Sequence, residues 1–406
     1  MKNISAKLNK YNQNHILQFE NELTSQEKLE LYSQVNNTDF SYLNEIGKEK
    51  NNQDVKIEPI DALTINQINL KKEQYKKIGL KALKDKKVGA LLLAGGMGTR
   101  LGSNEPKGMY NIGKTKEVYI FQRLIENMLD VVKECGEYIP LFVMTSEHND
   151  KITRKFLKDK NYFGYKEEYI KFFIQDMAPC TDFNGKILME SKSRIATSPN
   201  GNGGWFNSLL NDKDSREMLE KYNLEWINIF AVDNVLQKIA DPVFIGATLE
   251  NNVQIGAKVI RKADAFEKVG VMCKKNGRPS IIEYIDLGEE MATLTDKNGE
   301  RLYNFGVILN YLFNVKLLYE IKDKKLPIHV VTKKIEHIDN SGLAVKPTEP
   351  NGHKFEMLSV DMIELASSCL PFEVEREKEF APIKNKTGVD SVESAVELLE
   401  KNGYKL

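Results

Sequence analysis

The spacing of apolar and polar residues along this chain predicts where its strands and helices lie. VGALLLA (88–94) is a continuous apolar run beside glycine, which predicts a strand buried on both faces of a parallel sheet. PLFVMTS (140–146), YIKFFIQ (169–175) and WINIFAV (226–232) have the same texture. Residues 120–132 instead repeat apolar positions every three or four residues, which predicts a helix with one buried stripe.

Strands that alternate with helices predict an α/β fold, a doubly wound Rossmann-like mixed sheet. Between about 255 and 335 the strands VGVMCK, SIIEYI and LPIHVV alternate polar and apolar residues, which predicts an antiparallel or mixed extension of the sheet. Ligands of doubly wound sheets bind at the carboxyl ends of the strands. We therefore expect the chemistry in the residues that follow the apolar runs.

The two ends of the chain differ from this central part. Residues 1–86 are polar, and TSQEKLELYSQV (24–35) places an N-cap at Thr24 or Ser25 before apolar residues at helical spacing. The last stretch contains the turn-rich KPTEPNG and ends in a helical DSVESAVELLEKN. We expect three parts: a helical N-terminal segment (1–86), a catalytic domain (87–335) and a small C-terminal segment (336–406).

Composition narrows the classes of partner. Lys+Arg and Asp+Glu both number 58, so the net charge is zero and no global field attracts nucleic acid or an anionic membrane. The four cysteines form no CxxC pair, which suits a reducing compartment. No signal peptide and no membrane-spanning apolar run is evident. We expect a cytoplasmic protein with no nucleic acid, membrane or obligate protein partner.

LLLAGGMGTRLGSNEPKGMYNIG (91–113) is the most informative stretch, and two phosphate-binding templates fail on it. The P-loop pattern GxxxxGK[ST] is absent, and GxGxxG fails because Leu101 stands at the third glycine position. A looser GxGxxxG fits Gly96, Gly98 and Gly102, which leaves a nicotinamide-dependent oxidoreductase as a remote alternative. Such an enzyme needs an acidic residue for the ribose, and only Glu147 is a candidate.

The whole stretch favours a different site. Gly95, Gly96 and Gly98 let the backbone approach a polyphosphate and present N–H groups to it. Arg100 and Lys107 add two positive charges nearby. A docked dinucleotide needs little cationic help, whereas a departing pyrophosphate needs much. A plain β–α turn with exposed Arg and Lys is the structural alternative, but it requires fewer glycines.

This stretch resembles the signature loop of the eukaryotic-type UDP-sugar pyrophosphorylases, whose pattern is close to LAGGxGTRLGxxxPKGxY. The resemblance extends over roughly residues 70–390 and is greatest to the UDP-N-acetylhexosamine pyrophosphorylases. It implies a nucleotide-diphospho-sugar transferase fold. It also implies that UTP and N-acetylglucosamine 1-phosphate react to UDP-N-acetylglucosamine and pyrophosphate, with Mg²⁺ or Mn²⁺ as cofactor. Arg100, Lys107 and the late Lys384 of FAPIKN (380–385) would then act on the phosphates.

Two further stretches resemble the nucleotide-binding segments of the family. In FFIQDMAP (172–179), Gln175 would read the uracil edge, because an amide both donates and accepts. In PNGNGGWFNSL (199–209), Gly201 and Asn202 would contact the uracil and the sugar nucleotide. The GNGG run differs from the GHGD-type motif of UDP-glucose pyrophosphorylases, which favours an N-acetylhexosamine.

In AVDNVLQKIADP (231–242), Asp233 resembles the metal-binding aspartate of the family, at a strand end where a hard cation can bridge phosphates. Asp241, before Pro242, is more typical of a turn or helix cap.

The segments 269–287 and 301–310 resemble the sugar-binding strands. Gly270, Glu283 and Asn304 would contact the hexose. Phe305-Gly306-Val307 departs from the usual Ala-Gly-Asn of the family, so the resemblance leaves the identity of the hexose open.

Three alternatives to UDP-N-acetylglucosamine synthesis remain at this point. UDP-glucose pyrophosphorylase has the same chemistry on glucose 1-phosphate. The nicotinamide enzyme rests on GxGxxxG alone. A sugar-nucleotide sensor without catalysis would have no use for groups that stabilise a leaving pyrophosphate. The histidines share no metal-ligand spacing, and the absence of GxSxG means that there is no hydrolase signature.

Overall fold

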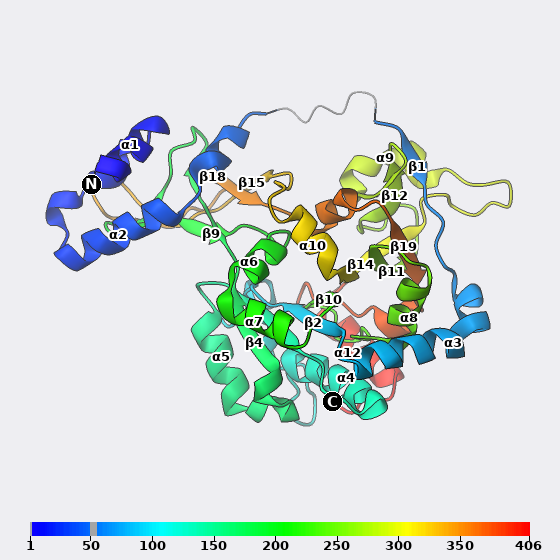
Figure 1. Ribbon diagram of the computed structural model, residues 1–406. Coiled ribbons are helices and arrows are strands. Elements are labelled where there is room, and N and C mark those ends of the chain that lie inside the picture. The colour runs from blue at the N-terminus through cyan, green and yellow to red at the C-terminus, as the bar shows by residue number, and fades with distance from the viewer. Residues whose placement is uncertain (1, 49–54) are drawn as a thin grey trace. The chain divides into compact units, whose positions relative to one another are not determined.

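The computed structural model describes residues 2–48 and 55–406 (Figure 1). The chain divides into two compact units, each assembled from three stretches. Unit 1 comprises Met1–Gln53, Gln175–Gly204 and Lys325–Ser359, and unit 2 comprises Asp54–Ile174, Trp205–Lys324 and Val360–Leu406. This division cuts the chain differently from the three consecutive segments expected from sequence, because distant stretches pack into the same unit.

Unit 2 is built on a mixed sheet, as the apolar runs predict. One path through it has the strand order β1-β12-β14-β10-β2-β3-β4, while β11 and β19 extend from β14, and β13 pairs with β12. β2, β3, β4 and β10 are parallel to one another, and β14 is antiparallel to β10. The strands of this sheet are β1 Ile57–Pro59, β2 Val88–Leu93, β3 Leu141–Thr145, β4 Ile170–Ile174, β10 Trp226–Ala231, β11 Ile255–Arg261, β12 Val271–Lys275, β13 Arg278–Ile282, β14 Phe305–Asn314 and β19 Cys369–Glu373.

Helices cover the sheet of unit 2. Four of them, α3, α4, α8 and α12, contribute Leu83, Leu124, Phe244 and Leu399 to the hydrophobic core that includes Leu92 of β2. The predicted helix over 120–132 is confirmed as α4. The helices are α3 Ile65–Lys84, α4 Ile120–Cys135, α5 Asp150–Asp159, α6 Trp205–Asn211, α7 Lys213–Lys221, α8 Pro242–Glu250, α9 Tyr284–Thr293, α10 Val315–Ile321, α11 Arg376–Glu379 and α12 Val392–Lys401.

The predicted extension between 255 and 335 is confirmed in part. β11, β12 and β13 pair antiparallel with their neighbours, apart from the parallel pair of β11 with β19. SIIEYI is not a strand throughout, because β13 ends at Ile282 and Tyr284 begins α9. LPIHVV (326–331) covers only the first three residues of strand β15 (His329–Lys333), which belongs to a separate sheet in unit 1. Periodicity identifies a strand but does not identify its partner.

The described residues of unit 1 form short helices and three small sheets. Its helices are α1 Lys2–Lys10 and α2 Ser25–Asn37, and Thr24 caps α2 in a capping box with Glu27. Leu31 and Val35 of α2 pack with Ile195 in its core. The sheets are β15-β18-β6, β17-β16-β7-β8 and β5-β9, with strands β5 Met177–Pro179, β6 Thr181–Asp182, β7 Met189–Ser191, β8 Arg194–Ile195, β9 Thr197–Pro199, β15 His329–Lys333, β16 His337–Ile338, β17 Ala344–Val345 and β18 Gly352–Glu356.

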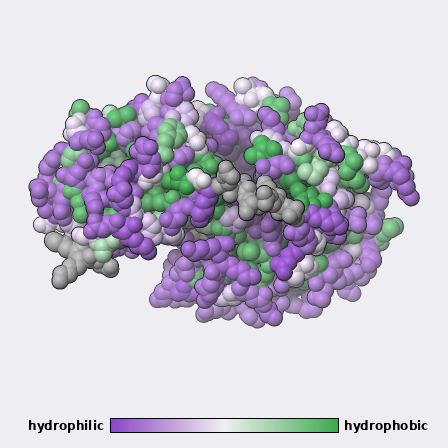
Figure 2. Space-filling model, turned by 90° about the horizontal axis from the view of Figure 1, so that it is seen from above, coloured by the Kyte–Doolittle hydropathy of each residue, from purple (hydrophilic) through white to green (hydrophobic). Residues whose placement is uncertain are grey.

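The surface is mostly polar. Figure 2 shows hydrophilic residues over most of the visible face, with apolar residues in small groups. Within residues 2–48 and 55–406, no helix has both the length and the apolar character needed to cross a bilayer.

Candidate active site

The strand order of unit 2 creates a switch point between β2 and β10. These strands run parallel with Leu93 opposite Ala231, and Figure 1 draws them side by side. From β2 the chain continues to β3 on one side of this pair, and from β10 it continues to β11, which pairs with β14 on the other side. The segments that leave β2 and β10 therefore diverge at this point. The glycine loop follows β2, and Asp233 follows β10.

The glycine loop is a closed hairpin. Met97 and Pro106 form an antiparallel bridge, and the N–H of Gly98 donates to the carbonyl of Glu105 at 2.8 Å. At the tip, a short 3-10 turn that carries Arg100 ends at Gly102, whose φ of 75° lies in the left-handed region that favours glycine. The loop therefore has a defined shape and holds Arg100 at its exposed end.

The three glycines predicted to bind phosphate differ in their surroundings. Among the described residues, no hydrogen bond uses the N–H of Gly95 or Gly96. Gly96 is exposed, and a Cβ there would meet nothing within 4 Å. The N–H of Gly98, in contrast, is engaged inside the hairpin. Gly95 and Gly96 thus offer free amides, whereas Gly98 shapes the loop.

Four of the charged side chains named from the sequence lie beside this loop. The Nζ of Lys107 lies 3.9 Å from Oδ2 of Asp233, and the Lys107 side chain is only 12% exposed. Burial lowers the pKa of Lys107, Asp233 opposes this shift, and Arg100 and Lys384 lower the pKa further. Three cations therefore share one region with the carboxylate of Asp233, and this excess of positive charge is typical of an anion site.

Lys384 reaches this region from near the end of the chain. Its Nζ donates to Oδ2 of Asp390 at 2.9 Å. The N–H of the preceding Ile383 donates to the carbonyl oxygen of Asp233 at 2.9 Å. The tertiary structure thus places Lys384 next to the Asp233 segment, and Asp390 holds the ammonium in place.

A divalent cation fits this region only together with phosphates. The described part of the chain has no group of three His, Cys, Asp or Glu side chains arranged to hold a metal. Asp233 supplies one carboxylate, and Mg²⁺ is commonly held by one or two carboxylates together with substrate phosphates. The neighbouring cations oppose a bare metal ion, so a polyphosphate must be present to favour it.

The predicted sugar-binding residues lie around the start of β14. A Cβ built on Gly270 would lie 3.0 Å from Cγ2 of Ile281 and 3.5 Å from both Oε1 of Glu283 and Cγ2 of Val307. Gly270, Glu283 and Val307 are therefore close neighbours, and Ile281 and Val307 make this place largely apolar. Asn304 is buried, and its Oδ1 accepts from the guanidinium of Arg301 at 3.2 and 3.3 Å.

The predicted nucleotide-binding residues of unit 1 lie in an ordered loop. Gly201 has φ of 87°, and a Cβ there would lie 2.3 Å from the carbonyl oxygen of Met357. Oδ1 of Asn202 accepts from the N–H of Ser359 at 2.9 Å, which leaves the amide nitrogen for a ligand. Gln175 directly follows β4 and is buried. The loop is therefore fastened by hydrogen bonds and is not a free turn.

Comparison with known proteins identifies the family. The sequence profile of the UTP–glucose-1-phosphate uridylyltransferase family matches residues 34–404. The chain belongs to this family.

Two curated relatives and a solved structure agree with the family assignment. UDP-N-acetylhexosamine pyrophosphorylase-like protein 1 of Xenopus tropicalis is 37% identical over 327 residues, which are 78% of this chain and 64% of that protein, less than two thirds of its length. UDP-N-acetylglucosamine pyrophosphorylase of Saccharomyces cerevisiae is 38% identical over 349 residues, 82% of this chain and 72% of that protein. The structure of uridine diphosphate N-acetylglucosamine pyrophosphorylase from Trypanosoma brucei, solved with an inhibitor, is 27% identical, has a TM-score of 0.82 and covers 97% of this chain and 83% of that one. The predicted fold class is confirmed.

A second charged cluster, around Lys258, was not predicted from the sequence. Asp241 caps α8, as expected, by accepting from the N–H of Val243 at 3.0 Å. It also lies 3.1 Å from the Nζ of Lys258, which is fully buried and contacts Oε2 of Glu379 at 2.5 Å. The signal was a lysine within the apolar strand IGAKVIR (255–261).

Two buried amide side chains, Gln237 and Asn234, were also not predicted from the sequence. Nε2 of Gln237 donates to the carbonyl oxygens of Ala231 and Asn234, both at 2.8 Å. Gln237 and Asn234 are 0% and 1% exposed. The sequence feature that could have predicted them is the presence of amide residues directly after an apolar strand.

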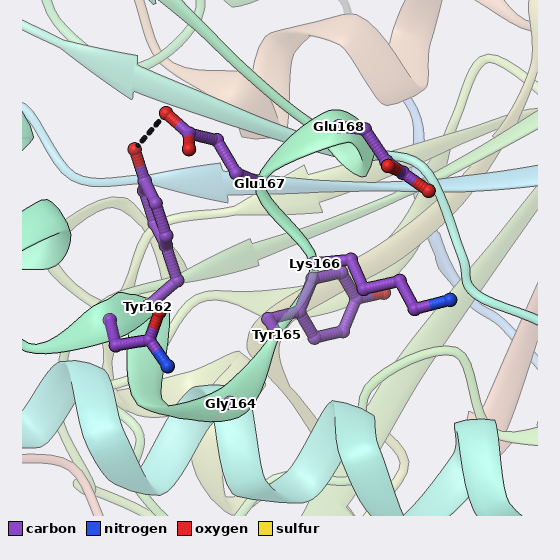
Figure 3. Close-up of a pocket in the computed structure, with 7 residues that line it drawn as sticks. Tyr162, Gly164, Tyr165, Lys166, Glu167 and Glu168 are labelled. Carbon is purple, nitrogen blue, oxygen red and sulfur yellow. Dashed lines mark hydrogen bonds between the residues drawn. The ribbon is translucent and has the colours of Figure 1, made fainter.

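One surface hollow of unit 2 lies outside this region, before β4 (Figure 3). It has a volume of about 690 Å³ and is lined by residues of 161–168. Its turn is left-handed from Asn161 to Gly164, with φ between 47° and 88°. In Figure 3 the hydroxyl of Tyr162 points to Glu167, with which it forms a hydrogen bond of 2.7 Å. The residues that line this hollow do not form a group of cations like that of Arg100, Lys107 and Lys384.

Proposed function

We propose that this chain is a uridylyltransferase that makes UDP-N-acetylglucosamine and pyrophosphate from UTP and N-acetylglucosamine 1-phosphate. A phosphate oxygen of the sugar phosphate attacks the α-phosphorus of UTP in line. The bond from that phosphorus to the bridging oxygen breaks, and pyrophosphate leaves. The nucleophile is already an anion, so the reaction needs no general base and no covalent enzyme intermediate. Catalysis then consists of positioning and charge stabilisation.

The observation that supports this function is the cluster of Arg100, Lys107 and Lys384 around Asp233 at the ends of β2 and β10. The free amides of the glycine loop and Arg100 would hold the β- and γ-phosphates. Lys107 would offset charge at the α-phosphate, and Lys384 would steady the incoming sugar phosphate. A dehydrogenase would not need this excess of cations, and the family match supports the transferase.

Asp233 would hold the Mg²⁺ or Mn²⁺ ion that we propose as cofactor. When bound, such an ion neutralises phosphate charge and orients the phosphates. The single carboxylate at a strand end suits a cation shared with substrate. The protein's own contribution is to fix that carboxylate beside Lys107.

Gln175, Gly201 and Asn202 would read the nucleotide base, and Gly270, Glu283 and Asn304 would contact the hexose. The names of the relatives support N-acetylglucosamine 1-phosphate as acceptor. The family's own description, together with Val307 at a position where the family usually has asparagine, supports glucose 1-phosphate as a second candidate. We also propose the cytoplasm as the compartment, because the four cysteines of the structure are free thiols.

A pyrophosphate-release assay tests this function. The protein is incubated with UTP and Mg²⁺ and, in separate reactions, the 1-phosphates of glucose, galactose, N-acetylglucosamine and N-acetylgalactosamine. The highest kcat/KM is expected for N-acetylglucosamine 1-phosphate. A higher value for glucose 1-phosphate would favour the second candidate. UDP-sugar binding without pyrophosphate release would instead indicate a sensor, and tight NADH binding without UTP binding an oxidoreductase.

A further inference from the structure

Asn234 joins two segments of unit 2 that lie far apart in sequence. Its side chain is 1% exposed. Its Nδ2 donates to the carbonyl oxygen of Glu379 at 2.8 Å, and its Oδ1 accepts from the N–H of Ala381 at 2.9 Å and of Leu236 at 3.4 Å. A carboxamide can donate and accept at once, and here both halves are used.

These hydrogen bonds of Asn234, which we call the joint, are followed along the backbone by further contacts toward two functional side chains. Asn234 pairs with Pro382 in an antiparallel bridge. The N–H of Ile383 donates to the carbonyl oxygen of Asp233 at 2.9 Å. Asp233 directly precedes Asn234, and Lys384 directly follows Ile383. The joint therefore fixes the backbone positions from which the Asp233 carboxylate and the Lys384 ammonium extend.

We propose that Asn234 is a positioning residue for uridyl transfer. It holds the segment 379–384 against the segment 233–236, so that Asp233 and Lys384 can act on the same substrate phosphates. Asn234 itself touches no substrate. This inference rests on the roles proposed above for Asp233 and Lys384.

The physical reason is the cost of small displacements in a preorganised site. Misplacing a catalytic group by about 1 Å can reduce the rate about 10²-fold. Removing the carboxamide leaves the carbonyl of Glu379 and the N–H of Ala381 without their buried partner. The segment that carries Lys384 is then free to shift to recover hydrogen bonds, and the lysine shifts with it.

A double-mutant cycle between Asn234→Ala and Lys384→Ala tests the proposal. If Asn234 acts through Lys384, each single substitution lowers kcat/KM by about 10²-fold. In the Asn234→Ala protein, Lys384→Ala should then cause a further loss of kcat/KM of less than about threefold. The reason is that the effects of substitutions at coupled residues do not add. Equal fold losses from Lys384→Ala in both backgrounds would overturn the proposal.

Asn228→Ala is the matched control. Asn228 is a buried amide of β10 whose Nδ2 donates to Oδ1 of Asn310 at 2.8 Å and whose Oδ1 accepts from the N–H of Ala240 at 2.7 Å. Among the described residues, it forms no hydrogen bond to the segment 376–385. Asn228→Ala should lower the melting temperature, as Asn234→Ala does, while its effect combines additively with that of Lys384→Ala.

Hydrogen exchange supplies a readout that does not depend on turnover. In Asn234→Ala the amides of Ala381 and Ile383 should exchange at least about tenfold faster than in the native protein, and in Asn228→Ala they should not. Unchanged exchange at these amides would contradict the joint. If Asn234→Ala does not fold, Asn234→Ser serves instead, because its neutral hydroxyl is shorter than the carboxamide and cannot hold the carbonyl of Glu379 and the N–H of Ala381 in the same way.

The proposed function and this inference fail in different ways. A native protein that releases no pyrophosphate with any sugar phosphate would contradict the function, whatever the exchange rates are. An active native protein with an additive cycle would contradict only the role of Asn234.

Discussion

Two lysine–carboxylate clusters include residues of the segment that follows β10. They differ in the distance between their charges, in burial and in the direction in which the lysine pKa is shifted. At the start of this segment, Lys107 lies 3.9 Å from Asp233, and burial, together with Arg100 and Lys384, lowers the pKa of Lys107. At its end, Lys258 lies 3.1 Å from Asp241 and 2.5 Å from Glu379. Burial opposes the charge of Lys258, but the two carboxylates outweigh it and raise the pKa.

The difference separates a binding site from a structural one. The Lys107 cluster has more cations than carboxylates, is partly exposed and has two free amides beside it. It is therefore incomplete without an anion. The Lys258 cluster is fully buried, and its carboxylates and backbone acceptor satisfy the ammonium. A lowered lysine pKa next to further cations is thus the better guide to function.

Lys258→Ala should have the largest effect, and on stability. Removing one partner of a buried ion pair leaves uncompensated charge, so we expect the free energy of unfolding to fall by about 3–5 kcal/mol. Urea denaturation measures it. Lys258→Met combined with Asp241→Asn and Glu379→Gln should recover much of the loss. Lys213→Ala, which removes an exposed pair with Glu217, should cause no measurable change.

Lys107→Ala should leave stability nearly unchanged and reduce turnover. Losing one preorganised charge stabiliser should lower kcat by roughly 10²–10³-fold. Steady-state kinetics with UTP and N-acetylglucosamine 1-phosphate measure the change. A loss smaller than about tenfold would remove Lys107 from the mechanism, and a large loss of stability would make the two clusters alike.

Asp233→Asn should weaken the binding of Mg²⁺ during turnover. The substitution keeps the shape of the side chain and removes the charge that attracts a hard cation. We expect the Mg²⁺ concentration for half-maximal activity to rise roughly tenfold or more. Titrating Mg²⁺ at saturating UTP measures it. An unchanged titration would assign the metal to the substrate phosphates alone.

The pH dependence should separate the two lysines. Because the pKa of Lys107 is lowered from 10.5, the alkaline fall of kcat/KM should begin below that pH. Asp233→Asn removes the group that raises this pKa, so the fall should move to lower pH. Lys258 has a raised pKa, so its contribution to stability should persist below pH 10.5 and disappear only as the pH rises through the folded pKa.

Kinetic pH profiles and unfolding measured at several pH values test these signs. An alkaline fall that stays in place in Asp233→Asn would contradict the assignment to Lys107. A loss of stability in the native protein well below pH 10.5, absent in Lys258→Met, would contradict the assignment to Lys258.

The sequence by itself determined the parallel strands, the helix over 120–132, the family and the candidate residues at the strand ends. These features are local: buried strands are continuously apolar, and a phosphate loop needs its glycines and charges within a few residues. The positions of Asp233 after β10 and of the glycine loop after β2 followed from the same reasoning.

Only the tertiary structure decided which charges meet. Lys384 and Asp233, or Lys258 and Glu379, are brought together by a fold in which distant segments pair, and no local pattern encodes such distances. The same holds for Asn234, whose amide looks ordinary until its partners near Glu379 are known. It also holds for LPIHVV, whose last three residues begin a strand that joins a sheet of unit 1. Sequence periodicity reports whether a residue is buried, whereas the partner of a buried polar group depends on the packing of the whole unit.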